Sequence, residues 1–384
     1  MRVTAEVDRL RRAGVAVLDF GPGEPDFATP DPVKAAAHQA IDANFTRYTP
    51  NPGTVELRQA IAARYRADYG VEYSEREVLA SAGGKQALFN TALALFGPGD
   101  EVILHAPVWP SLVEQVCLAE ATPVVVRAQA EDGFAVRAEA LLAAVTPQTR
   151  GIVINSPCNP TGAVMAEDEF AAVARAARAQ GFWLVLDLCY EQLIYGARPH
   201  NLPGIANREC RDQTVLCGSA SKAYAMTGWR CGWALGPARV IAAAAAIQSH
   251  ATSNVNSVTQ KAVTAALEGP QASVVAMREE YERRRDALCA WLDQPGLLGV
   301  HVPEGAFYVF VDVRAVLGPE LPSSAALAER LLQDDQVAVT PGEAFDAPGF
   351  IRLSYATSMD VLREGSRRLV AFAQRHAGAP AGAR

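Results

Sequence analysis

Two residues near the middle of the chain lie where polar chemistry is unusual. Asp187 ends the apolar run 182–187 (FWLVLD), and a carboxylate at the end of a buried strand is costly unless it has a partner. Lys222 lies in GSASKAYAMTGWRCGW (218–233), directly after the apolar run TVLC, among small residues that allow close approach. Partial loss of hydration lowers the pKa of a lysine and suits Schiff-base chemistry. The ordinary alternatives are a helix cap or salt bridge for Asp187 and a solvated Lys222.

Three further segments contain groups suited to anions. Residues 81–87 (SAGGKQA) place two glycines before an expected helix, so that backbone N–H groups could point at a phosphate, although a plain helix cap is equally consistent. Residues 155–162 (NSPCNPTG) form a turn after the apolar run GIVI. Arg352, in RLS at the end of a short strand, offers two parallel donors to a carboxylate, unless it is a surface arginine.

These residues follow elements that we expect to lie side by side. Apolar runs alternate with helical stretches such as 85–96 and 166–180, and the runs are 101–105, 123–127, 151–155, 182–187, 214–217 and 232–235. Continuous apolar strands separated by helices predict an α/β fold with a mainly parallel sheet covered on both faces. Ligands bind such sheets at the carboxyl ends of the strands. After about residue 270, a long charged helix (277–292), strands at 306–313 and 350–354 and a helix at 323–333 predict a smaller α+β domain.

Composition narrows the classes of function. The net charge of −7 over 384 residues argues against nucleic acid or an anionic membrane as the main partner. Seven scattered cysteines without CxxC fit a reducing compartment, and six dispersed histidines predict no metal site. The first 15 residues carry charges throughout, which is unlike a signal peptide. The run 241–247 (IAAAAAI) is too short to span a membrane and predicts a buried helix, so we expect a cytoplasmic protein.

The motifs taken together resemble the pyridoxal-phosphate (PLP) dependent class I/II aminotransferases of fold type I. In chain order they are GPGEPDFATP, RYTPNPG, SAGGKQA, NPTG, DLCY, SASKAYAMTGWR and RLS, and they extend from residue 21 to residue 354. AMTGWR and GGKQALFN are most similar to the branch of bacterial aspartate and aspartate/prephenate aminotransferases. The resemblance implies an N-terminal segment (1–30) that contributes to the small domain, a large PLP-binding domain (31–270), a small C-terminal domain (271–376) and a tail (377–384) that we expect to be disordered.

The resemblance also implies how the cofactor would be held. Lys222 would carry it as a Schiff base and move the proton of the substrate. Asp187 would pair with the ring nitrogen. Tyr190 and Asn159 would hydrogen-bond the ring oxygen, and Trp109 would stack on the ring, although a core tryptophan is its ordinary alternative.

Phosphate binding is implied for a second group of residues. Gly84, Lys85 and Gln86 would offer backbone donors, and Ser219 and Arg230 would add a hydroxyl and a charge. Tyr48 would reach the phosphate of the neighbouring subunit, which requires a homodimer with shared active sites.

The expected substrates are an amino acid and a 2-oxo acid. Arg352 would bind the α-carboxylate with help from Asn159 and the backbone of Gly23. Lys85 is positioned to meet a side-chain carboxylate, or is a solvated lysine. The chain departs from the branch in a shortened N-terminal segment and in Leu112, where relatives often carry a polar group.

We therefore expect ping-pong transfer of an amino group, with aspartate-like or glutamate-like substrates. The alternatives are another fold type I PLP reaction (elimination or cyclisation), transamination of an aromatic, neutral or specialised amino acid, and a non-catalytic PLP-binding module.

Overall fold

A seven-stranded sheet forms the centre of the larger part of the molecule. The computed structural model describes residues 2–196 and 200–377. The strand order is β2 (Val78–Ser81), β8 (Gly232–Leu235), β7 (Thr214–Ser219), β6 (Trp183–Asp187), β5 (Thr149–Asn155), β3 (Glu101–Ala106) and β4 (Thr122–Arg127). Strands β3 to β7 are mutually parallel, and β8 runs antiparallel to both of its neighbours. The predicted mainly parallel sheet is confirmed, with β2 as a strand that the sequence did not indicate.

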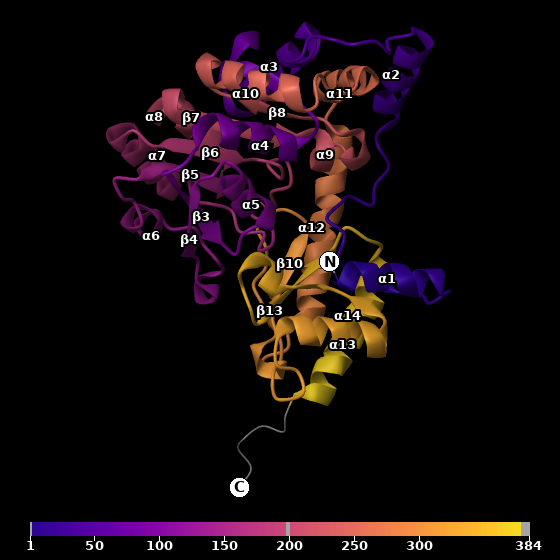
Figure 1. The fold of residues 1–384 in the computed structure, drawn as a ribbon. Helices are drawn as coiled ribbons and strands as arrows, with labels where there is room; N and C mark the ends of the chain where they lie inside the picture. Colours follow the sequence, from indigo (N-terminus) through magenta and orange to yellow (C-terminus); the bar gives the residue numbers. More distant parts are fainter. Residues whose placement is uncertain (1, 197–199, 378–384) are drawn as a thin grey trace.

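Helices cover both faces of this sheet (Figure 1). One face packs against α3 (Val55–Tyr69), α6 (Ala138–Ala143), α7 (Glu167–Gln180) and α8 (Leu202–Glu209), and the other against α4 (Gly84–Leu95), α5 (Pro110–Leu118) and α10 (Ala238–Ala251). Side chains alternate along each strand, so Ile152 and Ile154 join the first layer while Val153 joins the second. Burial on both faces explains why these strands are continuously apolar.

Short helices and turns complete the larger part. Helices α2 (Asp31–Asp42) and α11 (Ser257–Glu268) pack against each other, and α9 (Ala220–Ala223) follows β7. Single turns of 3-10 helix occur at Glu75–Glu77, Ala130–Asp132, Arg211–Gln213, Thr227–Trp229, Arg314–Val316 and Gly342–Phe345. Within the described ranges, none of the helices has the length and apolar character needed to cross a membrane.

The run 241–247 is helical, as predicted, but it is not buried all round. It lies in α10, where Ile241 and Ala244 face the sheet while Ala242, Ala243 and Ala246 are exposed. Alanine favours the helix through its intrinsic propensity and does not require burial. The expectation of a buried helix was therefore wrong for its outer face.

A smaller unit is joined to the sheet by the long helix α12 (Ala272–Leu292) (Figure 1). It contains an antiparallel sheet in the order β12 (Thr340–Pro341), β13 (Phe350–Ser354), β10 (Tyr308–Asp312) and β9 (Gly299–Val300), with α13 (Ser324–Asp335) and α14 (Met359–His376). Near the N-terminus, α1 (Arg2–Arg12) contacts α13, and β1 (Leu18–Asp19) pairs in parallel with β11 (Val337–Ala338). Both ends of the chain therefore meet in this unit. The residue limits of the domains stay predictions, and the predicted tail after Ala377 lies outside the described residues.

The N-terminal segment is fixed by an aromatic side chain. Phe20 is fully buried and lies against Gly365 of α14, where a Cβ atom would come within 2.2 Å of its ring. Only glycine leaves room for this ring at that point of the helix. The buried contact connects the first 20 residues firmly to the last helix.

Candidate active site

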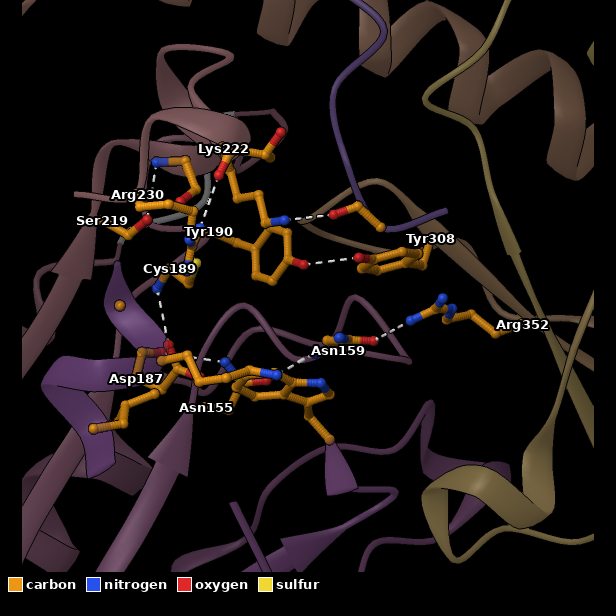
Figure 2. A pocket seen from close by; sticks show the side chains of 17 residues that line it. Asn155, Asn159, Asp187, Cys189, Tyr190, Ser219, Lys222, Arg230, Tyr308 and Arg352 are labelled. Atoms are coloured by element: carbon orange, nitrogen blue, oxygen red, sulfur yellow. Dashed lines mark hydrogen bonds between the residues drawn. The ribbon is translucent and has the colours of Figure 1, made fainter. Parts of the chain in front are cut away.

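A cavity of about 400 Å³ opens where β5, β6 and β7 end. The register aligns Asn155 with Asp187 and Asp187 with Cys217, so the segments that leave these strands start side by side. The cavity is lined by Gly23, Gly84, Lys85, Leu88, Trp109, Asn155, Asn159, Asp187, Cys189, Tyr190, Ser219, Ser221, Lys222, Thr227, Arg230, Tyr308 and Arg352. Figure 2 shows these side chains converging from the large sheet and from the smaller unit. The structure thus brings together every predicted site residue except Gln86 and Tyr48.

Asp187 is a buried carboxylate on the floor of the cavity. Its side chain accepts a hydrogen bond of 3.1 Å from the backbone N–H of Cys189, and only 3% of the residue is exposed. Burial raises the pKa of Asp187 to about 6, while this hydrogen bond and the charge of Lys222 oppose the rise. Leu112, where relatives often carry a polar group, is buried in the apolar layer of α4 and α5 and offers Asp187 no hydrogen bond. A cationic group on a ligand would therefore stabilise the charged form of Asp187.

Asn155 connects three parts of the site and was not predicted. Its backbone N–H donates to Nε2 of His105, and its side-chain Oδ1 accepts from the backbone N–H of Asn159 at 2.8 Å. Burial lowers the pKa of His105 to about 4, which agrees with a neutral ring that accepts this bond. The amide of Asn155 also donates to the carbonyl oxygen of Asp187. These contacts fix the loop that carries Asn159, and the position of Asn155 at a strand end was the available signal.

Lys222 reaches into the cavity from α9. Its Nζ donates a hydrogen bond to the carbonyl oxygen of Gly23 and lies 5.9 Å from the ring centroids of Tyr190 and Phe307. Figure 2 shows the Lys222 side chain extending beside the ring of Tyr190. The small neighbours Ala220 and Ser221 are buried, so no larger side chain competes for this space. The amine is thus held inside the cavity by a single carbonyl, which a covalent partner could replace.

The start of α4 forms a cradle for an anion. The helix begins at Gly84 after Gly83, whose φ of 92° favours glycine. The backbone N–H groups of Gly84 and Lys85 precede the first helical bond, whereas that of Gln86 donates to the carbonyl oxygen of Gly83. A Cβ atom on Gly232 would lie 2.3 Å from the nitrogen of Gly84, and one on Gly83 would lie 2.3 Å from Nη2 of Arg230. Ser219 completes this end of the cavity. Backbone donors, a guanidinium and a hydroxyl suit a phosphate.

Arg352 occupies the opposite end and is a buried cation. Only 7% of the residue is exposed, and it donates to Oδ1 of Asn159 at 2.9 Å and to the carbonyl oxygen of Gly21 at 2.7 Å. Its buried Nε has no hydrogen-bond partner, and the acceptors of its other nitrogens within the described residues, on Asn159, Gly21 and Thr340, are all neutral. A buried charge of this kind requires a counter-charge, and a carboxylate ligand would supply one.

Lys85 lies at the mouth of the cavity. It is exposed, and its Nζ is 4.8 Å from the ring centroid of Trp109. Gln115 donates to the backbone carbonyl of Lys85 and thereby supports the first turn of α4. A flexible ammonium in this place can meet an anion that enters above the tryptophan.

Two predicted residues lie outside the lining. The side chain of Gln86 accepts from the backbone N–H of Ala82 and donates to Thr252. Tyr48, in the loop between α2 and α3, is 92% exposed. Their predicted contacts with the phosphate stay predictions.

Further lining residues had not been singled out. They are Leu88, Asn155, Cys189, Ser221, Thr227 and Tyr308. Cys189, Ser221 and Thr227 lie next to or within predicted motifs, so proximity in sequence could have suggested them. Tyr308 lies in a strand of the smaller unit, and its sequence context gave no such signal.

The cavity fits PLP on three observations. Asp187 is a buried acid without a charged hydrogen-bond partner, the cradle at Gly84 accommodates a phosphate, and Lys222 lines the same cavity with its amine at the Gly23 carbonyl. Asp187 suits the ring nitrogen of PLP, the cradle suits its phosphate, and Lys222 suits its aldehyde.

Comparisons with known proteins agree with this geometry. Residues 15–369 match the family model described as aminotransferase class I and II. The chain is 43% identical to an aspartate aminotransferase of Streptomyces avermitilis over 96% of this chain and 92% of that protein. It is 42% identical to an aspartate/prephenate aminotransferase of Cereibacter sphaeroides, covering 96% and 94%. The structure of the Thermus thermophilus aspartate aminotransferase with maleate superposes with a TM-score of 0.91 at 41% identity, covering 97% and 95%.

Proposed function

This chain belongs to the class I and II aminotransferase family, and from that premise we propose that its preferred substrates are dicarboxylic amino acids and their 2-oxo acids. The enzyme is a PLP-dependent aminotransferase that moves an amino group between an L-amino acid and a 2-oxo acid. The preference for acidic substrates rests on one observation: cations lie at both ends of the space where substrate must fit, Arg352 inside and Lys85 at the mouth. A second carboxylate would meet Lys85.

The residues of the cavity divide the work of catalysis. Bound PLP withdraws electrons from the substrate carbon that loses its proton. Lys222 would take that proton at Nζ and deliver it to the cofactor carbon that keeps the amino group. Asp187 would hold the proton on the ring nitrogen, and Tyr190 and Asn159 would bind the ring oxygen. Trp109 would support the ring.

Arg352 orients the substrate by its α-carboxylate. The bond from Arg352 to Asn159 connects this carboxylate site with the cofactor site. Gly23 lines the same cavity, and its backbone N–H is the group of this residue that can donate to a carboxylate. Fixing the substrate at these points presents its α-hydrogen to Nζ of Lys222.

The test is a screen of single half-reactions. Purified enzyme with PLP is mixed with one amino acid at a time, and the cofactor absorbance is followed until the amino group has been transferred. Rapid change with aspartate or glutamate and slow change with alanine or leucine is the expected result. Prephenate, which appears in the name of the Cereibacter relative, belongs among the amino acceptors of the reverse screen.

A substitution isolates the contribution of Lys85. Lys85→Ala should lower kcat/KM for aspartate by roughly tenfold or more, because one charged hydrogen bond is worth about 1.5–3 kcal/mol. The rate for a neutral amino acid should change little. Arg178→Ala, which removes an exposed cation in the last turn of α7 that does not line the cavity, is the control. Equal losses for acidic and neutral substrates would contradict the proposed contact.

We also propose that the enzyme is a homodimer with shared active sites. The support is a set of exposed large side chains on α2, α3 and the loop between them, namely Ile41, Tyr48 and Val55. A second copy that covers this surface would bury Tyr48, which is consistent with its predicted contact to the partner's phosphate. Sedimentation of the purified protein measures the assembly.

Mixed dimers test whether the sites are shared. Tyr48→Phe chains are combined with Lys222→Ala chains, each of which alone forms two impaired sites. If Tyr48 acts across the interface, a mixed dimer contains one native site, because the intact Lys222 then meets the intact Tyr48 of the other chain. Recovery of tight PLP binding at one site per mixed dimer is expected. No recovery would show that Tyr48 does not act across the interface.

The seven unpaired cysteines support a further proposal, that the enzyme works in the cytoplasm. Fractionation of the source cells with an antibody to the protein tests this. Recovery in a secreted or membrane fraction would contradict it.

A further inference from the structure

Tyr308 occupies the junction between the two sheets. It lies at the start of β10 in the smaller unit, is 1% exposed, and lines the cavity (Figure 2). In the antiparallel register Tyr308 is opposite Ser354, which places it diagonally beside Arg352 on the same face of the sheet. One strand pair therefore presents both side chains to the site.

Tyr308 contacts three groups that the proposed reaction uses. Its hydroxyl lies 2.8 Å from the hydroxyl of Tyr190, and either can be the donor. Its ring lies beneath the guanidinium of Arg352, with Cζ 4.3 Å from the ring centroid. Its hydroxyl would be 2.6 Å from a Cβ atom on Gly23, so this glycine leaves the space that Tyr308 occupies.

We propose that Tyr308 is a positioning residue that sets both the Tyr190 hydroxyl against the cofactor and the Arg352 guanidinium against the substrate carboxylate. The inference rests on the proposed function, because it assumes the assigned roles of Tyr190 and Arg352. The hydroxyl and the ring of Tyr308 perform separate parts of this task, so they can be removed separately.

The hydroxyl acts through Tyr190. Tyr190 has a single proton, and when it donates that proton to the ring oxygen of PLP it can only accept from Tyr308. A hydrogen bond donated by Tyr308 polarises the O–H bond of Tyr190 and strengthens the hydrogen bond from Tyr190 to the ring oxygen. Without that support the ring oxygen is less stabilised as an anion, and the nearby nitrogen of Lys222 keeps its proton to higher pH.

The ring acts on Arg352. The guanidinium donates to Asn159 and to Gly21, and the face of Tyr308 supports it from below. A cation over an aromatic face in a desolvated site is held more strongly than at the surface. Loss of the ring should therefore weaken the binding of a carboxylate, while loss of the hydroxyl alone should not.

Two variants and two binding readouts test the inference. Tyr308→Phe removes the hydroxyl only, and Tyr308→Leu removes the ring as well. Tyr355→Phe is the matched control, because Tyr355 is a fully buried tyrosine of the same apolar cluster that does not line the cavity. The first readout is the pH midpoint of the visible absorbance of the PLP-loaded protein. The second is the dissociation constant of maleate, a dicarboxylate that cannot be transaminated.

The expected results differ between the variants. Tyr308→Phe should raise the midpoint by about half to one pH unit, the equivalent of one ordinary hydrogen bond, and leave maleate binding within about twofold. Tyr308→Leu should give the same rise and weaken maleate binding about five- to tenfold. Tyr355→Phe should change neither quantity. The remaining charged or titratable groups of the described lining are unchanged in every variant; they are Lys85, Asp187, Cys189, Tyr190, Lys222, Arg230 and Arg352.

Failure of the inference is distinguishable from failure of the proposed function. Absence of a visible absorbance band in the PLP-loaded wild type would contradict the proposed function. A band that shifts in Tyr190→Phe but not in Tyr308→Phe would keep that function and overturn the inference. Because Tyr308→Phe adds no volume, it should remain folded, and an unchanged midpoint in that variant is sufficient to refute the role of the hydroxyl.

Discussion

Replacement of Asp187 by asparagine should make the cofactor-free protein more stable at neutral pH. Asparagine has nearly the shape of aspartate and can accept the same hydrogen bond from the backbone of Cys189, but it brings no charge into the protein interior. The variant therefore isolates the cost of burying the charge. The same change should impair catalysis, since asparagine cannot hold a proton on the ring nitrogen.

The size of the effect follows from the pKa. Burial raises the pKa of Asp187 from 3.8 to about 6, so the folded state binds a proton that the unfolded state releases. Because the folded-state pKa is the higher one, the contribution to stability is full below about pH 4 and is lost as the pH rises through about 6. A difference of about two pKa units corresponds to about 3 kcal/mol, which is the stability that the charged Asp187 costs the folded protein above about pH 6.

Urea unfolding of the cofactor-free proteins at pH 8 and pH 5 provides the measurement. Asp187→Asn should exceed the wild type by about 3 kcal/mol at pH 8 and by about half of that at pH 5. Asp8→Asn, which neutralises an exposed aspartate of α1, should change stability little at either pH. Saturation with PLP should reduce the advantage of the variant, because PLP supplies the missing cation. A variant no more stable than the wild type at pH 8, or an equal gain at both pH values, would refute the reasoning.

Three other substitutions address the remaining parts of the site. Lys222→Ala should abolish the visible band of bound PLP and multiple turnover while circular dichroism stays unchanged; a retained band would remove Lys222 from its role. Arg352→Lys should lower kcat/KM about ten- to hundredfold by removing one of two parallel charged hydrogen bonds, and an unchanged kcat/KM would exclude a carboxylate contact. Gly232→Ala should weaken PLP binding by about tenfold or more, since its Cβ atom would lie 2.3 Å from the nitrogen of Gly84 and displace the start of α4; spectroscopic titration with PLP measures this, and wild-type affinity would argue against the cradle.

The sequence predicted the large sheet and most of the cavity because the relevant signals are local. Asp187 ends one continuous apolar run and Asn159 lies in the turn after another, and parallel strands bring their carboxyl ends to one edge. Lys222 likewise follows β7, which pairs with β6. The convergence of these strand ends was therefore expected from a parallel sheet, while the roles of the individual residues were implied by the resemblance of the motifs to the aminotransferase family.

The features that sequence reasoning missed depend on tertiary contacts. The run 232–235 was expected as a strand, but its antiparallel direction in β8 is set by the chain path around Lys222 and leaves no mark on the residues themselves. Strand β2 is only four residues long and ends in Ser81, so its pattern was too short to recognise. Tyr308 is remote in sequence from the motifs that it contacts, and an aromatic residue in a strand is ordinarily a core residue.

The parallel pairing of β1 with β11 also determines how early the smaller unit can fold during synthesis on the ribosome. Leu18 leaves the synthesis machinery early, yet its partner Val337 follows 319 residues later. At typical elongation rates of about 5–20 residues per second, that interval is roughly 15–65 s. During this time Gly365 has not been synthesised, so the ring of Phe20 cannot be buried against it. The large sheet can form first, but Arg352 arrives later still, so a nascent chain could bind the cofactor before it could bind a substrate.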